Sequence, residues 1–117
     1  MFNKLKTAKY ALDVGSGTGY LTAAMALVMP NESKTFGIEH VPELVKKSIE
    51  NIKKSNPELM EGRVRIEQGD GRVGWHYDKT IKFDAIHVGA AADKVPVGLV
   101  EQLAEDGLLI IPVGGEH

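Results

Sequence analysis

Three glycines at alternate positions constrain the fold of this chain more than any other feature. They lie in the stretch Asp13–Gly19, between the short apolar segment Tyr10–Val14 and the Ala-, Leu- and Met-rich segment Tyr20–Met29. The first segment predicts a strand, and the second, which contains neither Gly nor Pro, predicts a helix. Glycines between them allow a tight turn and bring free N–H groups at the helix N-terminus close to a ligand.

The rest of the chain continues to alternate short apolar runs with longer amphipathic segments. Further strands are expected at 35–39, 63–67, 83–88 and 108–113, and further helices at 42–56 and 95–103. Strict alternation in the second of these strands predicts a position near a sheet edge, whereas the denser last two are typical of parallel strands buried on both faces. The order of elements predicts an α/β fold, a three-layer sandwich with a mainly parallel, Rossmann-like sheet.

Composition excludes several classes of protein. The chain has 117 residues, the length of one domain, so residues 1–117 are expected to form a single unit. A net charge of −2 gives no support for binding nucleic acid through bulk positive charge, and no apolar run approaches the ~18 residues of a membrane helix. The absence of cysteine excludes a disulfide scaffold, a thiolate metal site and a Cys nucleophile. With no apolar leader near Met1, a cytoplasmic location is expected.

An acidic residue lies where a nucleotide-binding fold of this kind needs one. Glu39 ends the second expected strand, 20 residues after Gly19. An acid at this position can accept hydrogen bonds from both hydroxyls of a ribose. Loop, helix, strand and acid together predict a nucleoside site. The alternative is that the glycines form only a tight turn and that Glu39 is a solvated strand end.

Two departures from the dinucleotide-binding pattern indicate which nucleoside is bound. The spacing is G-x-G-x-G rather than G-x-G-x-x-G, with Tyr20 in place of the usual third glycine. Asp13 also places a carboxylate just before the loop, where it would repel a pyrophosphate and attract an ammonium or sulfonium group. S-adenosylmethionine carries both of these cations and no phosphate, so the pattern favours this cofactor over a nicotinamide dinucleotide.

Small residues follow the third and fourth expected strands. Gly69-Asp70-Gly71 comes after the third, and Gly89 to Ala92 after the fourth. Ligands of open α/β sheets bind beyond the carboxyl ends of the strands, so both turns are candidates for contact. Asp70 can accept a hydrogen bond from an adenine amino group, or it can cap its own turn; the sequence leaves both interpretations open.

Several segments together resemble one family. Ala11–Thr22 resembles the first motif of class I methyltransferases. Gly69–Arg72, Phe83–Ala92 and Leu109–Gly114 are similar to the protein-L-isoaspartate (D-aspartate) O-methyltransferases, which repair damaged aspartyl and asparaginyl sites. The resemblance implies strand order 3-2-1-4-5, S-adenosyl-L-methionine as cofactor with S-adenosyl-L-homocysteine as product, and isoaspartyl-containing proteins and peptides as partners.

The resemblance also implies which residues contact the cofactor. They lie in the glycine loop and beyond the second and third strands: Gly15, Ser16, Gly17, Thr18, Glu39, His40, Asp70 and Gly71. Asp13 joins them on the charge argument above. His87 lies within a strand and is interpreted as a structural histidine with satisfied hydrogen bonds. The four scattered histidines show no ligand spacing, so no metal site is expected.

The implied reaction needs no general base. An isoaspartyl α-carboxylate is already ionised at neutral pH, because a carboxyl pKa lies at about 4. Catalysis then depends on positioning and exclusion of water, and we assign no catalytic residue. Alternatives are a class I methyltransferase acting on a small molecule or RNA, a non-catalytic binding module and, more distantly, a dehydrogenase. The Phe83–Ala92 segment favours the repair enzyme over the first of these.

The sequence departs from the family pattern at both ends. Family members carry a substrate-binding segment before the first motif and two strands after the fifth, whereas here Asp13 follows only twelve residues and the chain stops at His117. We therefore expect a cofactor-binding core, cut at both ends, that binds cofactor weakly and is catalytically poor. The fifth strand would lack its outer partner, which predicts self-association through that edge.

Overall fold

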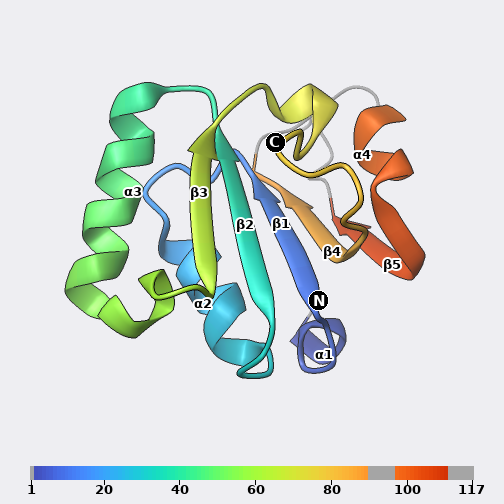
Figure 1. The fold of residues 1–117 in the computed structure, drawn as a ribbon, viewed down its shortest axis with the longest axis horizontal. Coiled ribbons are helices and arrows are strands. Elements are labelled where there is room, and N and C mark those ends of the chain that lie inside the picture. Colours follow the sequence, from blue (N-terminus) through green and yellow to red (C-terminus); the bar gives the residue numbers. More distant parts are fainter. Residues whose placement is uncertain (1, 90–96, 111–117) are drawn as a thin grey trace, which may run out of the picture.

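A parallel sheet of five strands forms the centre of the described chain (Figure 1). The computed structural model describes residues 2–89 and 97–110. The strands are β1 Tyr10–Val14, β2 Lys34–Glu39, β3 Val64–Gln68, β4 Phe83–Val88 and β5 Leu103–Ile110. Their order in the sheet is β3-β2-β1-β4-β5, and every neighbouring pair is parallel. The predicted α/β fold and strand order are therefore confirmed.

Most helices pack on one face of the sheet, and the segment after β3 and the helix before β5 lie on the other (Figure 1). The α-helices are α1 Phe2–Leu5, α2 Tyr20–Val28, α3 Pro42–Ser55 and α4 Val97–Glu101, and two short 3₁₀ helices are η1 Pro57–Met60 and η2 Gly71–Val73. Pro42 occupies the first turn of α3, where its missing N–H costs nothing. None of the described helices is both long enough and apolar enough to cross a membrane.

The side chains of each central strand alternate between two cores. On one face, Ala11 and Ala85 pack against Leu5, Met25 and Met29 of the α1 and α2 region. On the other face, a larger cluster joins the strands to the segment after β3 and to α4; it comprises Leu12, Val14, Phe36, Ile38, Trp75, Phe83, Ile86, Val88 and Leu99. Burial on both faces agrees with the dense apolar residues of β1 and β4.

The fourth helix and the fifth strand differ from the prediction. The helix expected over 95–103 ends at Glu101 in its described part, and β5 begins at Leu103 rather than Leu108. Gln102 lies at the change from helix to strand: its carbonyl accepts from Phe83 N (2.7 Å), while its amide exchanges hydrogen bonds with the backbone of Trp75. The register between β4 and β5 shifts from Phe83–Leu103 to Ala85–Leu108. Within this shift, Asp106 has a φ of 64°, in the left-handed region. Residues 111–113 of the predicted strand lie outside the described residues.

Candidate cofactor site

A hollow of about 840 Å³ opens at the carboxyl edge of the sheet. Its described wall comes from the ends of β1, β2, β3 and β4 and from α3, η2 and α4: Val14, Gly15, Ile38, Glu39, His40, Val41, Leu44, Gly69, Asp70, Gly71, Arg72, Val88, Gly89 and Leu99. Parallel strands bring their carboxyl ends to one edge, which is why residues so distant in the sequence meet here.

Gly15 leaves open space on the floor of this hollow. Its φ of +76° belongs to the left-handed region that favours glycine, and its N–H donates to Ile38 O at 2.7 Å. Among the described residues, a Cβ built on Gly15 would find only Gly89 N within 4 Å, at 4.0 Å. A ligand can therefore approach the backbone at Gly15 closely.

Glu39 connects the glycine loop to the start of α3. Its side chain is almost fully buried; Oε1 accepts from Gly17 N at 2.9 Å and Oε2 accepts from Val41 N at 3.1 Å. His40 Nδ1 lies 3.4 Å from Oε2. Each carboxylate oxygen has two acceptor sites, so both oxygens can still accept one further hydrogen bond. Two backbone donors thus hold the carboxylate in place, and each oxygen keeps one acceptor site for another donor.

Asp70 both caps its own turn and lines the hollow, so the two interpretations left open by the sequence are compatible. Its Oδ1 accepts from Arg72 N at 2.9 Å, and the Arg72 guanidinium contacts both carboxylate oxygens. The hydrogen bonds from the Arg72 side chain and backbone lower the pKa of Asp70 to about 2. The carboxylate is therefore charged throughout the physiological pH range.

Asp13 does not line the hollow. Its carboxylate is only 2% exposed. Oδ2 accepts from Thr22 Oγ1 at 2.7 Å, and Oδ1 lies 3.1 Å from His87 Nδ1. In the structure this carboxylate ties β1 to α2 and β4, and its contact with a cationic ligand group stays a prediction. His87 has a partner, which confirms its interpretation as a structural histidine.

The remaining predicted residues of the glycine loop do not line the hollow. Of the nine predicted residues, Gly15, Glu39, His40, Asp70 and Gly71 line the hollow, whereas Asp13, Ser16, Gly17 and Thr18 do not. The Ser16 side chain packs against Gly37, and its Oγ has no hydrogen-bond partner among the described residues. Thr18 is exposed, and its carbonyl accepts from Asn51 Nδ2 on α3 at 3.0 Å.

Most wall residues that the sequence analysis missed are apolar. They are Val14, Ile38, Val41, Leu44, Val88 and Leu99, joined by the charged Arg72. Val41 and Leu44 lie two and five residues after Glu39, so their place at the start of the helix after this acid could have predicted that they line the hollow. Leu99 reaches the hollow only through the packing of α4, and no local pattern indicates that.

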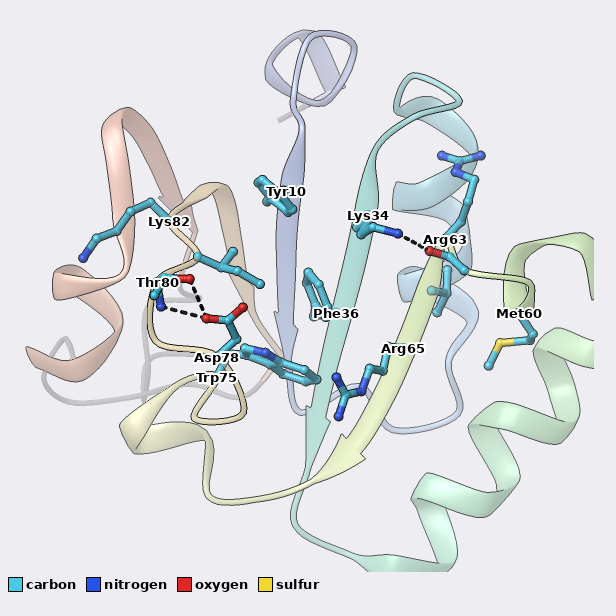
Figure 2. A pocket seen from close by; sticks show the side chains of 13 residues that line it. Tyr10, Lys34, Phe36, Met60, Arg63, Arg65, Trp75, Asp78, Thr80 and Lys82 are labelled. Carbon is cyan, nitrogen blue, oxygen red and sulfur yellow. Dashed lines mark hydrogen bonds between the residues drawn. The ribbon is translucent and has the colours of Figure 1, made fainter.

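A second hollow lies on the face of the sheet instead of at its edge (Figure 2). Phe36 and Trp75 form its aromatic floor, with ring centroids 4.7 Å apart, and the Arg65 guanidinium lies 5.2 Å from the centre of Trp75. Its lining includes neither the glycine loop nor the acidic ends of β2 and β3. Among the described residues, no cluster of His, Asp and Glu could hold a metal ion. The edge hollow is therefore the candidate site.

Comparison with known proteins gives the same family as the motifs. The family model described as protein-L-isoaspartate(D-aspartate) O-methyltransferase (PCMT) matches residues 1–117. Protein-L-isoaspartate O-methyltransferase 1 of Arabidopsis thaliana is 50% identical over 112 residues, covering 94% of this chain and 48% of the relative. The Caenorhabditis elegans protein-L-isoaspartate O-methyltransferase is 48% identical over 112 residues, covering 95% of this chain and 49% of the relative. The chain thus spans about half the length of these curated relatives.

A solved structure agrees in detail with the fold. A Plasmodium falciparum protein assigned to PCMT and crystallised with S-adenosyl-L-homocysteine superposes with a TM-score of 0.87 at 42% identity, covering 99% of this chain and 56% of that one. The sheet order and the glycine loop define a Rossmann-like class I methyltransferase core. Within that class, the chain belongs to the protein-L-isoaspartate (D-aspartate) O-methyltransferase family.

Proposed function

We propose that this chain is the cofactor-binding core of an S-adenosylmethionine-dependent protein carboxyl O-methyltransferase. Its substrate would be the α-carboxylate of L-isoaspartyl or D-aspartyl residues in damaged proteins. The observation that carries the proposal is the pair of acidic strand ends, Glu39 and Asp70, on the wall of one hollow beside the glycine loop. Membership of the PCMT family supports the choice of substrate.

The residues of the hollow fit an adenosyl group. Glu39 keeps one acceptor site on each oxygen for the ribose hydroxyls. Val41, Leu44 and Leu99 offer apolar surface for a flat base, and the open space at Gly15 allows the ligand to lie against the backbone. Each group of an adenosine thus has a chemically matched neighbour on this wall.

The same wall disfavours a dinucleotide. Two carboxylates, Glu39 and Asp70, would repel a pyrophosphate. Among the described lining residues, Arg72 is the only Arg or Lys, and its charge is paired with Asp70 at 2.9 Å. This balance supports the choice of a cofactor without phosphate over a nicotinamide dinucleotide.

The chemistry requires little of the protein beyond positioning. When bound, S-adenosylmethionine supplies a methyl group on a positively charged sulfur, which an ionised carboxylate can accept directly. The described residues therefore have to bind and orient the reactants and to exclude water. None of them has to hold a proton. Family membership favours this protein substrate over the alternative of a small molecule or RNA.

The test joins this chain to the segments that flank the matched region in the A. thaliana relative. Methyl release is measured with an isoaspartyl peptide and with the same peptide carrying ordinary aspartate. We expect turnover with the first peptide only. A fusion that binds S-adenosylhomocysteine in calorimetry yet methylates neither peptide would overturn the assigned substrate, and one that binds no cofactor would overturn the assigned cofactor.

A further inference from the structure

The second hollow, which we call the face hollow, lies apart from the candidate cofactor site (Figure 2). The two hollows have no lining residue in common. Lys34 and Phe36, in the first half of β2, line the face hollow, whereas Ile38 and Glu39 at the end of this strand line the edge hollow. The face hollow has a volume of about 840 Å³, which is large enough for a ligand of its own.

Apolar side chains form the floor of the face hollow. The ring centroid of Phe36 lies 4.7 Å from that of Trp75 and 6.4 Å from that of Tyr10. Phe36 and Trp75 are buried, whereas Tyr10 and Ile81 are half-buried and leave apolar surface for a ligand. A floor of this kind favours a ligand that carries an aromatic or aliphatic group.

Positive charge surrounds this floor. The described lining contains four cationic side chains and one carboxylate, that of Asp78; the cations are Lys34, Arg63, Arg65 and Lys82. The chain as a whole has a net charge of −2, so the excess of positive charge is a local property of this hollow. A concave surface with charges of one sign attracts ligands of the opposite sign.

Neither lysine of the hollow has a carboxylate partner among the described residues. Lys34 Nζ donates to Gly62 O at 2.8 Å, and Lys82 Nζ donates to Glu101 O at 2.7 Å. Both acceptors are uncharged backbone carbonyls, and an ammonium group has three donors. Each lysine therefore keeps its full charge and two donors for an anionic ligand.

The single carboxylate of the hollow is engaged within its own turn. Asp78 Oδ1 accepts from Thr80 N at 3.0 Å and from the Thr80 hydroxyl. Arg65 Nε pairs with Glu67 Oε2 at 2.8 Å, but Glu67 does not line the hollow. The acidic groups near the floor thus do not neutralise the two lysines.

The two lysines lie on opposite sides of the floor. Figure 2 shows Lys82 on one side and Lys34 on the other, with Tyr10 and Phe36 between them. A ligand that contacts both lysines therefore needs more than one anionic group, with an apolar part between these groups. An extended polypeptide offers this arrangement, because its side chains are spaced along a backbone that rises about 3.3 Å per residue.

We propose that the face hollow binds an acidic polypeptide segment in which carboxylates flank an aromatic or aliphatic side chain. The carboxylates contact Lys34 and Lys82, and the apolar side chain lies on the floor beside Phe36. This binding does not rest on the proposed function, because it uses no residue of the candidate cofactor site.

Fluorescence of Trp75 tests this binding locally, because Trp75 is the only tryptophan of the chain. The chain is titrated with a short peptide that has glutamates at both ends and phenylalanine in the middle, and with the same peptide carrying glutamine in place of glutamate. We expect a saturable change with the acidic peptide only. Saturating S-adenosylhomocysteine is expected to leave the affinity for this peptide unchanged, because the two hollows share no lining residue.

Substitution of both lysines removes charge from the two sides of the floor. The affinity of Lys34→Gln combined with Lys82→Gln is expected to be about 2- to 30-fold lower, as for the loss of two exposed ion pairs. Lys53→Gln combined with Lys54→Gln is the matched control, because these lysines of α3 are also exposed and do not line the hollow. The control is expected to bind like the unaltered chain.

Several results would overturn the proposal. Equal affinity for the acidic and the glutamine peptides, or equal affinity of the two double variants, would show that these charges bind no peptide. The same fluorescence change with inorganic phosphate would assign the hollow to small anions, and a change with phosphatidylserine vesicles but not with the peptide would assign it to a membrane surface. A change on dilution of the chain alone would assign it to a second copy. Calorimetry that detects peptide binding to the chain but not to the fusion would show that a flanking segment fills the hollow.

Discussion

Asp13 and His87 face each other across neighbouring parallel strands. They are register partners of β1 and β4, and His87 Nδ1 lies 3.1 Å from Asp13 Oδ1. The second carboxylate oxygen accepts from Thr22 Oγ1 on α2. A buried acid thus joins β1, α2 and β4 just before the glycine loop.

Removal of this contact is expected to destabilise the fold. His87→Ala leaves Asp13 Oδ1 buried without its side-chain partner, which costs about 1–3 kcal/mol of the free energy of unfolding. Urea denaturation measures the change. His76→Ala serves as the control because His76 is exposed, and it is expected to stay within about 0.5 kcal/mol. Equal stability of His87→Ala and the unaltered chain would contradict a structural role for the contact.

Replacement of Glu39 is expected to weaken cofactor binding. Glu39→Ala removes the charged acceptor for ribose hydroxyls and also leaves Gly17 N–H and Val41 N–H without their acceptor. We expect a loss of about 1–3 kcal/mol in the binding free energy of S-adenosylhomocysteine, measured by calorimetry. Glu43→Ala, which alters an exposed acid in the first turn of α3, is the control. Equal affinity of Glu39→Ala and the unaltered chain would remove Glu39 from the site.

The titration of Asp70 is expected to report on Arg72. In the folded chain its pKa is lowered from 3.8 to about 2, chiefly by hydrogen bonds from Arg72. A depressed folded-state pKa favours the folded state above pH 3.8, and this contribution is lost as the pH falls towards 2. NMR of the side-chain carboxyl carbon is expected to give a midpoint near 2 that returns towards 3.8 in Arg72→Ala. A midpoint that is insensitive to this substitution would refute the assigned cause.

A polypeptide of these 117 residues is expected to bind cofactor more weakly than its longer relatives and to methylate little. The A. thaliana and C. elegans relatives are about twice as long, and a carboxylate nucleophile needs orientation and a dry site. Methyl release from an isoaspartyl peptide, compared with the A. thaliana enzyme at equal concentration, measures the difference. Comparable turnover would show that the matched region alone is sufficient.

A polypeptide of these 117 residues alone is expected to self-associate through the outer edge of β5. This strand lies at the end of the sheet that residues 2–89 and 97–110 form, and Leu108 on it is 37% exposed. Sheet edges with apolar residues and unpaired backbone groups readily pair with another chain. Sedimentation at several concentrations is expected to show a shift towards monomer in Leu108→Lys, but not in Leu27→Lys, which alters an exposed leucine on α2. A monomer at every concentration in the unaltered chain would contradict the expectation.

Local patterns in the sequence determined the strands, the glycine loop and the acidic strand ends. The alternation of short apolar and longer amphipathic segments depends on the chain's own periodicity, so the strands and the places of Glu39 and Asp70 at strand ends followed from it. The sheet order followed from the family resemblance alone. The start of α3 at Pro42 and its end before Pro57 were likewise readable, because proline restricts its own backbone and that of the residue before it.

Tertiary structure alone decided which partners the polar side chains take. Asp13 was expected to face a ligand, but packing brings it to His87, 74 residues away. Gln102, between the helix and β5, exchanges hydrogen bonds with the backbone of Trp75, 27 residues away. Such contacts depend on how whole elements pack, and a single hydrogen-bonded side chain has no periodicity that would reveal its partner from the sequence.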